Sequence, residues 1–163
     1  DFISNRYPAL SRMNFSSPYV DLPQRLTVRE NLLVYAKLYG LRQPSASVDN
    51  MLQTFQLEEF SDRRLRKLSA GQKTRVSLAK ALINKPDFIL ADEPTGNLDP
   101  ETSQEIMGVL LAIAKEGTSV LMATHDISIM EQFPSRTFRV EDQTVKEVNP
   151  MNEFNPFEQV KFE

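Results

Sequence analysis

One apolar run in the sequence ends in two adjacent carboxylates, and this feature constrains the fold more than any other. Residues 88–91 read Phe-Ile-Leu-Ala and are followed directly by Asp92, Glu93 and Pro94. A short, continuously apolar run is typical of a buried strand in a parallel sheet. Ligands bind at the carboxyl ends of such strands, so we expect the two carboxylates to lie in a binding site, although any buried strand can end in acids near solvent.

The segments on either side of this strand alternate between helical and extended patterns. Helices are predicted at 69–84, 100–115 and 127–132, and further strands at 119–123, 136–141 and 144–148. Such alternation, with continuous apolar strands, predicts an α/β fold in which helices cover both faces of a parallel sheet. Residues from 149 onward, with two Asn-Pro steps and three phenylalanines, are predicted to form a tail.

The first part of the chain is predicted to be irregular and then helical. Residues 1–20 contain prolines and show no periodic pattern. Thr27 and Glu30 form a capping-box pattern that predicts a helix, and Ser47 is predicted to cap a second, shorter helix. Residues 58–67 are rich in charge and are predicted to form a solvated connector.

The composition excludes several classes of protein. The 19 basic and 22 acidic residues give a net charge of −3, so we expect no nucleic-acid partner. The absence of cysteine excludes a disulfide scaffold and fits a reducing compartment. The longest apolar stretch without glycine, 109–114, is too short to span a membrane. Because the chain begins at Asp1 without a signal peptide, we expect a fragment that acts at a membrane only through a partner.

Ser69-Ala70-Gly71-Gln72 lies at the start of the helix predicted at 69–84 and has two interpretations. As an S-x-x-Q pattern it is an ordinary capping box, and taken alone the motif favours this structural role. The same geometry suits phosphate binding, because a helix N-terminus carries the positive end of the helix dipole and glycine permits close backbone approach. The presence of the strand that ends in Asp92 and Glu93 favours the second interpretation, phosphate binding.

Together, these motifs resemble those of the ATP-binding cassette (ABC) transporter ATPase family. In the family's order and spacing, the resemblance is to the signature loop (Leu68-Ser69-Ala70-Gly71-Gln72), the Walker B strand (ending in Asp92-Glu93), the D-loop (Asn97-Leu98-Asp99) and the switch histidine (His125). The resemblance implies a P-loop NTPase-like parallel sheet with an inserted α-helical subdomain. It assigns residues 1–24 to a remnant of the N-terminal core and Q-loop region, 25–68 to the helical subdomain, 69–148 to the α/β core and 149–163 to a tail.

The resemblance also implies a role for each site residue. Asp92 would hold Mg²⁺ through water, and Glu93 would accept the proton of the water that attacks the γ-phosphorus of ATP. His125 would hydrogen bond to the γ-phosphate, although a lone histidine is more often a surface or core residue. Asp99 is an expected helix N-cap and, in the family, also reaches across a dimer interface. The signature residues that would contact ATP held by the opposite subunit are Ser69, Ala70, Gly71 and Gln72.

The sequence departs from the family pattern in two places. It has no G-x-x-x-x-G-K-[ST] phosphate loop, and its five glycines are too scattered to form one. The loop and its strands are therefore expected to belong to a missing N-terminal segment. Ser16 stands where the family has the Q-loop glutamine, in an alignment anchored on residues 26–31. Its hydroxyl can ligate Mg²⁺ but is shorter than glutamine, so the Q-loop is interpreted as a substituted one.

The expected function is that of the ATP-binding subunit of a transporter. A head-to-tail dimer with a second ABC ATPase subunit would bind and hydrolyse ATP and drive a transmembrane permease at the cytoplasmic face of the membrane. Residues 15–86 resemble exporter ATPases, whereas 91–148 resemble the cell-division ATPase FtsE and lipoprotein-release ATPases, so a cell-division role is an alternative. A soluble translation-factor cassette typically has Asn-His-Leu-Asp where this chain has Gly96-Asn97-Leu98-Asp99. The last alternative is an inactive interaction fragment.

Overall fold

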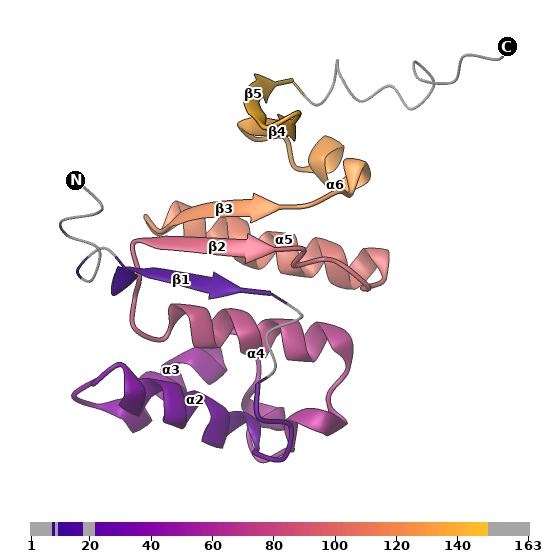
Figure 1. The fold of residues 1–163 in the computed structure, drawn as a ribbon. Helices are drawn as coiled ribbons and strands as arrows, with labels where there is room; N and C mark the ends of the chain where they lie inside the picture. The colour runs from indigo at the N-terminus through magenta and orange to yellow at the C-terminus, as the bar shows by residue number, and fades with distance from the viewer. Residues whose placement is uncertain (1–7, 9, 18–21, 150–163) are drawn as a thin grey trace, which may run out of the picture. The chain divides into compact units, whose positions relative to one another are not determined.

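The computed structural model describes residue 8, residues 10–17 and residues 22–149, which fall into two compact units (Figure 1). The first unit is Asp1–Thr124 and the second is His125–Glu163. The remnant predicted at 1–24 lies partly outside the described residues, and the predicted tail lies outside them beyond Asn149.

A parallel, three-stranded sheet forms the centre of the first unit. Its strands, in the order β1-β2-β3, are β1 (Met13–Ser16), β2 (Phe88–Asp92) and β3 (Ser119–Ala123). β2 and β3 form at the apolar runs, as predicted. β1 corrects the prediction that residues 1–20 are irregular. Met13 pairs with Phe88, which is distant in the sequence, so no local periodicity reveals this strand.

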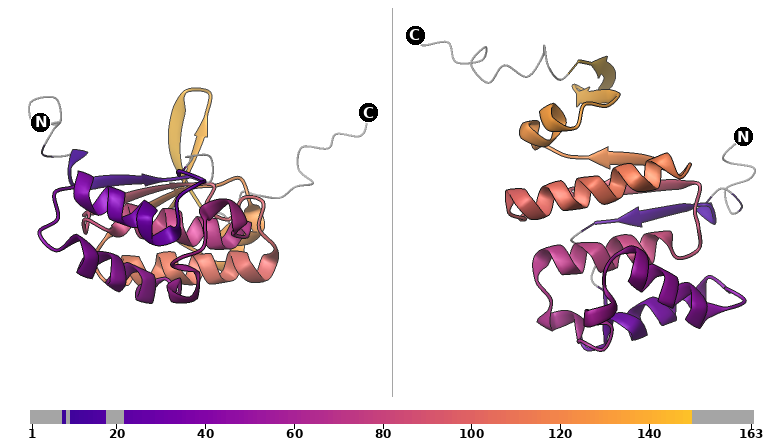
Figure 2. Two further views of the ribbon diagram at one scale, coloured as in Figure 1. Left: turned by 90° about the horizontal axis from the view of Figure 1, so that it is seen from below. Right: turned by 180° about the vertical axis from the view of Figure 1, so that it is seen from behind.

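The main helices of the first unit lie on one side of this sheet (Figure 2). They are α2 (Val28–Leu38), α3 (Pro44–Thr54), α4 (Ala70–Leu82) and α5 (Pro100–Lys115). On the helical side of β2, Ile89 and Ala91 are fully buried. On the other side of the sheet, Phe15 and Leu121 are 40% and 47% exposed. None of these four helices covers that side, which corrects the prediction that helices cover both faces.

The capping box predicted at Thr27 is present at the start of α2. The Glu30 N–H donates to Thr27 Oγ1 (3.1 Å), and the Thr27 N–H donates to Glu30 Oε2 (2.7 Å). The second helix, α3, begins at Pro44 rather than after Ser47. Proline suits the first turn of a helix because it has no N–H to leave unpaired there.

Apolar side chains of α2, α3 and α4 form a core that the charged connector also enters. The largest fully buried side chains of these helices and the residues next to them include Leu32, Leu52, Phe55 and Leu78. Most residues of the connector are exposed, as the sequence predicts, and it contains two 3-10 turns, Glu58–Phe60 and Leu65–Lys67. Leu65 is only 1% exposed, and a bridge between Thr27 and Arg64 ties the connector to the start of α2. The residues that lead into α4 are thereby anchored.

The described residues of the second unit, 125–149, form one helix and a hairpin, as predicted. These are α6 (Ile127–Gln132) and the antiparallel strands β4 (Thr137–Glu141) and β5 (Thr144–Val148). Asp142 and Gln143 join the strands, and both have positive φ, as a type I′ hairpin turn requires. In neither unit is a described helix long and apolar enough to cross a membrane.

Candidate functional site

β2 carries two carboxylates at its carboxyl end, as the sequence predicts. Asp92 is its last residue and stands opposite Ala123 of β3. Glu93 follows with a φ of +46°, in the left-handed region. A non-glycine residue there is strained by about 1–3 kcal/mol, and such strain collects at functional sites. The Glu93 N–H still donates to the Ala123 carbonyl (2.9 Å), so the turn begins immediately beyond the sheet.

Hydrogen bonds from Gly96 and Thr124 hold the turn at Glu93, and the backbone at Gly96 lies close to it. The Gly96 N–H donates to the Glu93 carbonyl (3.0 Å), and Thr124 Oγ1 donates to Glu93 Oε2 (3.4 Å). A Cβ at Gly96 would lie 3.2 Å from the Glu93 carbonyl oxygen, closer than ordinary van der Waals contact. Glycine at this position therefore lets the loop at 94–98 fold closely over the backbone of Glu93.

Ser69 begins α4 with the capping box that the sequence predicts. The Gln72 N–H donates to Ser69 Oγ (3.2 Å), and the Ser69 N–H donates to Gln72 Oε1 (3.0 Å). The Ser69 hydroxyl accepts in this bond and keeps its own proton for another acceptor. The structural interpretation of the motif is confirmed, and it leaves the hydroxyl able to donate to an anion at the helix N-terminus.

Gly71 has a packing role that the sequence does not reveal. It is buried where the first turn of α4 meets the first turn of α5, and a Cβ at this position would overlap Thr102 Cγ2. A larger residue would therefore force the two helices apart. Further along both helices, Arg75 Nη2 and Glu105 Oε2 form an ion pair (2.6 Å) that lines a hollow of about 260 Å³ beside Ser69.

Asp99 caps α5 through both of its carboxylate oxygens, and this confirms its predicted structural role. The Thr102 N–H donates to Asp99 Oδ1 (2.9 Å), and Thr102 Oγ1 donates to Asp99 Oδ2 (2.6 Å). The side-chain hydrogen bond from Thr102, followed by the backbone one, lowers the pKa of the exposed Asp99 carboxyl group.

Comparison with protein families decides what kind of protein this is. The family model described as ABC transporter matches residues 8–96, more than half of the chain. This chain belongs to the ABC transporter family. The resemblance to the ABC transporter ATPase family is thereby confirmed.

Several curated ABC proteins are similar to this chain. The cell division ATP-binding protein FtsE of Bacillus subtilis (strain 168) is 36% identical over 137 residues, which cover 82% of this chain and 60% of FtsE. FtsE of Mycobacterium tuberculosis is 43% identical over 117 residues, which cover 71% of this chain and 51% of that protein. The Nod factor export ATP-binding protein I of Paraburkholderia xenovorans is 35% identical over 136 residues, which cover 82% of this chain and 45% of that protein. The chain thus spans about half the length of the curated relatives it matches.

Solved ABC structures share the fold of this chain. CbiO1 of Clostridium perfringens, part of the ABC transporter complex CbiONQ, matches with a TM-score of 0.78 and 31% identity, covering 86% of this chain and 58% of CbiO1. A dimeric ATP-binding cassette in a post-hydrolysis state, bound to ADP and Pi, matches with a TM-score of 0.70 and 28% identity. The match covers 90% of this chain and 67% of the cassette chain. These matches confirm the predicted P-loop NTPase-like α/β fold.

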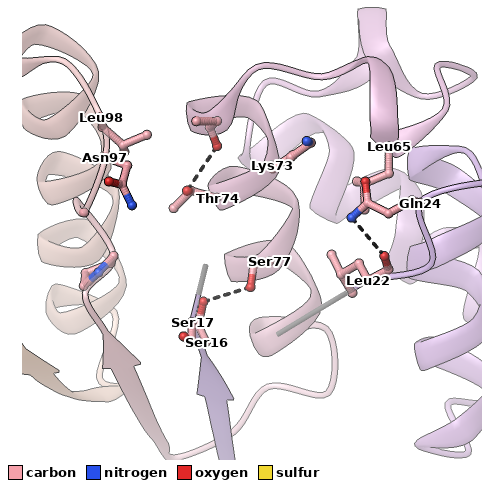
Figure 3. A pocket seen from close by; sticks show the side chains of 13 residues that line it. Ser16, Ser17, Leu22, Gln24, Leu65, Lys73, Thr74, Ser77, Asn97 and Leu98 are labelled. Atoms are coloured by element: carbon pink, nitrogen blue, oxygen red, sulfur yellow. Dashed lines mark hydrogen bonds between the residues drawn. The ribbon is translucent and has the colours of Figure 1, made fainter. Parts of the chain in front are cut away.

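Within this ABC fold, the hydroxyl at the Q-loop position is turned away from Asp92. Ser16 stands opposite Ala91 in the sheet, and its Oγ lies on the helical side, 3.1 Å from Ser77 Oγ of α4 (Figure 3). Asp92 follows Ala91, so its side chain leaves β2 on the other side. The structure does not bring the two groups together, and Mg²⁺ ligation by Ser16 stays a prediction.

A pocket of about 160 Å³ lies beside Ser16, between the end of β1, one face of α4 and the loop that contains the D-loop (Figure 3). Its wall is mostly apolar, and the hydroxyl and amide groups in it belong to Ser16, Ser17, Gln24, Thr74, Ser77 and Asn97. Sequence reasoning missed this pocket because its wall comes from segments that are far apart in the chain. The pocket connects the Q-loop position, the signature helix and the D-loop.

The Asp92 carboxylate at the end of β2 fits a magnesium ion that also has ligands from water and substrate. Within the described ranges, no group of three or more His, Cys, Asp or Glu residues could hold a metal ion by itself. Mg²⁺ is commonly bound by one or two carboxylates together with substrate phosphates. Asp92 supplies such a carboxylate at the carboxyl end of β2, where parallel α/β sheets bind ligands.

The switch-histidine position, His125, is the first residue of the second unit. It directly precedes Asp126, whose Oδ1 accepts from Ser128 Oγ (2.6 Å) and caps α6. The hydrogen bond from the Ser128 side chain is the main cause that lowers the pKa of Asp126, and the charge of His125 adds to it. A helix cap therefore fixes the backbone next to His125, and its role toward the γ-phosphate stays a prediction.

Proposed function

We propose that this chain is the helical subdomain and second half of an ATP-binding subunit, which binds and hydrolyses ATP as a head-to-tail dimer and drives a membrane partner. The observation that carries the proposal is the pair Asp92 and Glu93 at the carboxyl end of β2, where parallel α/β sheets bind their ligands. The left-handed backbone of Glu93 supports a catalytic role, because strained residues of this kind cluster at active sites.

In this proposal, each site residue has one task. Asp92 holds Mg²⁺ through water, and a bound Mg²⁺ stabilises negative charge on the phosphates. Glu93 accepts the proton of the water that attacks the γ-phosphorus, and the Thr124 hydroxyl, 3.4 Å from Glu93 Oε2, orients the carboxylate. Ser69 and the N–H groups at the start of α4 donate to ATP bound by the partner subunit. His125 hydrogen bonds to the γ-phosphate.

The proposed partners are a second ABC ATPase subunit and a transmembrane permease that holds the protein at the cytoplasmic face of the membrane. Similarity to a dimeric cassette bound to ADP and Pi supports the first partner. Similarity to CbiO1, which is part of an ABC transporter complex, supports the second. The net charge of −3 gives no reason to add a nucleic acid to these partners.

A second candidate function is that of a cell-division ATPase similar to FtsE. FtsE proteins match this chain at 36% and 43% identity, whereas a Nod factor export protein matches at 35%. Deletion of the gene distinguishes the two candidates. Long, undivided cells would favour cell division, and normal division with loss of an exported or imported substrate would favour transport.

The test of catalysis uses this chain extended at its N-terminus by the phosphate-loop segment of Bacillus subtilis FtsE, referred to as the extended chain. Glu93→Gln keeps the shape of the side chain but cannot take a proton. ATP turnover is therefore expected to fall by about 100-fold or more, while ATP binding is retained and an ATP-bound dimer accumulates. Glu116→Gln, which changes an exposed carboxylate at the end of α5, is the matched control. Near-normal turnover of the Glu93→Gln chain would remove Glu93 from the role of base.

A further inference from the structure

The signature loop and the D-loop begin neighbouring helices, and the side chain of Thr102 contacts both. Thr102 is the third residue of α5. Its N–H and its hydroxyl donate to the two carboxylate oxygens of Asp99, at 2.9 and 2.6 Å. Its methyl carbon, Cγ2, faces Gly71 in the first turn of α4. One residue thus connects a D-loop carboxylate to the signature glycine.

The two contacts of Thr102 depend on each other. A threonine side chain occupies discrete rotamers, and the rotamer that directs Oγ1 toward Asp99 also directs Cγ2 toward Gly71. If the methyl group rotated away from Gly71, the hydroxyl would have to leave Asp99. Because interiors are closely packed, a displacement of the α4 N-terminus toward α5 must move Thr102 and with it the carboxylate of Asp99.

The packing of Thr102 on Gly71 is not the only contact between these two helices. The Arg75–Glu105 ion pair joins α4 and α5 one turn further on, at 2.6 Å. The Glu105 side chain is 52% exposed, however, and ion pairs of exposed residues contribute little to stability. The ion pair joins the two helices away from the loops, whereas Thr102 contacts Gly71 of the signature loop and Asp99 of the D-loop.

We infer that Thr102 is a positioning residue that couples the signature loop to Asp99, so that displacement of one is transmitted to the other within the same subunit. The inference rests on the proposed function, which assigns the two loops to ATP sites at a dimer interface. In that dimer, ATP held against Ser69 fixes the start of α4. Gly71 and Thr102 then fix the Asp99 carboxylate that reaches toward the partner.

The first test measures the coupling in this chain without any nucleotide. Gly71→Ala is expected to push Thr102 away and so to raise the pKa of Asp99 toward its ordinary value, followed by NMR titration of the Asp99 carboxyl carbon. Adding Thr102→Ser removes Cγ2 but keeps the hydroxyl, so it should lower the Asp99 pKa again. Gly108→Ala, at a glycine of α5 with open space around it, is the control and should leave the pKa unchanged.

Thr102→Val gives a second, independent variant that keeps the shape of threonine and loses only the hydroxyl. It should also raise the Asp99 pKa. The charged side chains in the first two turns of α4 and α5 are Lys73 and Arg75 on α4 and Glu101 and Glu105 on α5. They are the same in every variant, so their effects cancel. An Asp99 pKa that is unchanged in both Gly71→Ala and Thr102→Val would overturn the inference.

The second test uses the extended chain and separates the coupling from the proposed function. Thr102→Val is expected to lower kcat for ATP hydrolysis by about tenfold or more, as for other misplaced site groups, with little change in KM. If the unsubstituted extended chain hydrolyses no ATP, the proposed function fails, and the pKa results alone decide the coupling. If Thr102→Val raises the Asp99 pKa but leaves kcat unchanged, the inference that the contact transmits displacement to the site is overturned.

Discussion

Lys80 donates from Nζ to the carbonyl oxygen of Phe15 at 3.0 Å, and this bond joins the signature helix α4 to the end of β1. Lys80 is only 7% exposed. Its ammonium forms no ion pair with a carboxylate of the described residues, and the ring of Tyr35 on α2 lies 5.5 Å from it. A sheet strand, the signature helix and the helical subdomain therefore meet at one buried cation.

Burial lowers the pKa of Lys80 from its usual 10.5, and this predicts a pH-dependent stability. The unfolded chain binds the proton more tightly than the folded chain. The cost of burying the charge is therefore fully present below the lowered pKa and is removed as the pH rises toward 10.5. Relative to Lys80→Met, the wild-type chain is expected to gain free energy of unfolding as the pH is raised from neutral to about 10. Urea denaturation of both chains across this range measures the difference.

Lys80→Arg is the matched control for this prediction. Arginine keeps its charge throughout the range, so the difference in unfolding free energy between Lys80→Arg and Lys80→Met should not depend on pH. Tyr39, whose pKa burial raises, titrates in all three chains and cancels from the comparison. If the difference in unfolding free energy between the wild-type chain and Lys80→Met is equally independent of pH, Lys80 is not buried as a charged group.

Substitution of two glycines by alanine should have opposite effects on stability. Gly71→Ala is expected to lower the free energy of unfolding by about 1–3 kcal/mol, because the new methyl group overlaps Thr102 Cγ2. Gly108→Ala is expected to raise it by about 0.5–1 kcal/mol, because alanine favours a helix and nothing lies near this position. Denaturation of the two variants of this chain checks both signs, and equal effects would contradict the close approach of α4 and α5.

The strained backbone at Glu93 predicts that asparagine is better tolerated there than glutamine. Asparagine adopts positive φ more readily, so Glu93→Asn should be more stable than Glu93→Gln by up to about 1 kcal/mol. The same pair of substitutions at Glu116, where φ is −78°, should show a much smaller difference. Thermal melts of the four variants test this, and the prediction fails if the two positions respond alike.

The isolated 163-residue chain is predicted to bind MgATP poorly. Its sequence contains no G-x-x-x-x-G-K-[ST] motif and so lacks the cradle of backbone N–H groups that such a loop offers to the phosphates. Calorimetric titration of the isolated chain and of the extended chain compares the two directly. Micromolar binding by the isolated chain would contradict the prediction.

Sequence patterns predict the features of this chain that depend on near neighbours. The caps at Ser69 and Asp99 were predictable because each side chain bonds to an N–H three positions later. The apolar run of β2 likewise predicts a buried strand and the place of the two carboxylates after it. These local features are enough to identify the ABC family, whereas the roles of the individual motif residues stay predictions.

The features that were missed depend on contacts between distant positions. β1 is held by pairing with β2, and Ser16 is fixed by Ser77 in the middle of α4. Sequence reasoning explained Gly71 by phosphate approach alone, whereas Thr102, in another helix, also requires a glycine there. Such requirements appear only when the two helices are packed together.

The contact between Gly71 and Thr102 also determines which residue can test the signature loop. A charged residue at Gly71 would collide with Thr102, so loss of function there could not be separated from loss of packing. Ser69 is exposed and avoids this problem. Aspartate is as good an N-cap as serine, and its charge suits the positive end of a helix. Ser69→Asp should therefore keep the melting temperature of this chain, whereas Ser69→Ala should cost about 1 kcal/mol of stability.

In the extended chain, the same two substitutions separate a phosphate contact from a cap. If Ser69 lies against the γ-phosphate held by the partner subunit, the carboxylate in Ser69→Asp repels that phosphate. ATP-driven dimerisation and hydrolysis should then be lost. The ATP affinity of the monomer should change little, because Ser69 would contact the ATP of the partner subunit and not the ATP of its own. If Ser69 only caps α4, Ser69→Ala should instead be less stable, dimerise less and hydrolyse ATP more slowly than Ser69→Asp. Analytical ultracentrifugation with and without ATP, on both variants, decides between these outcomes.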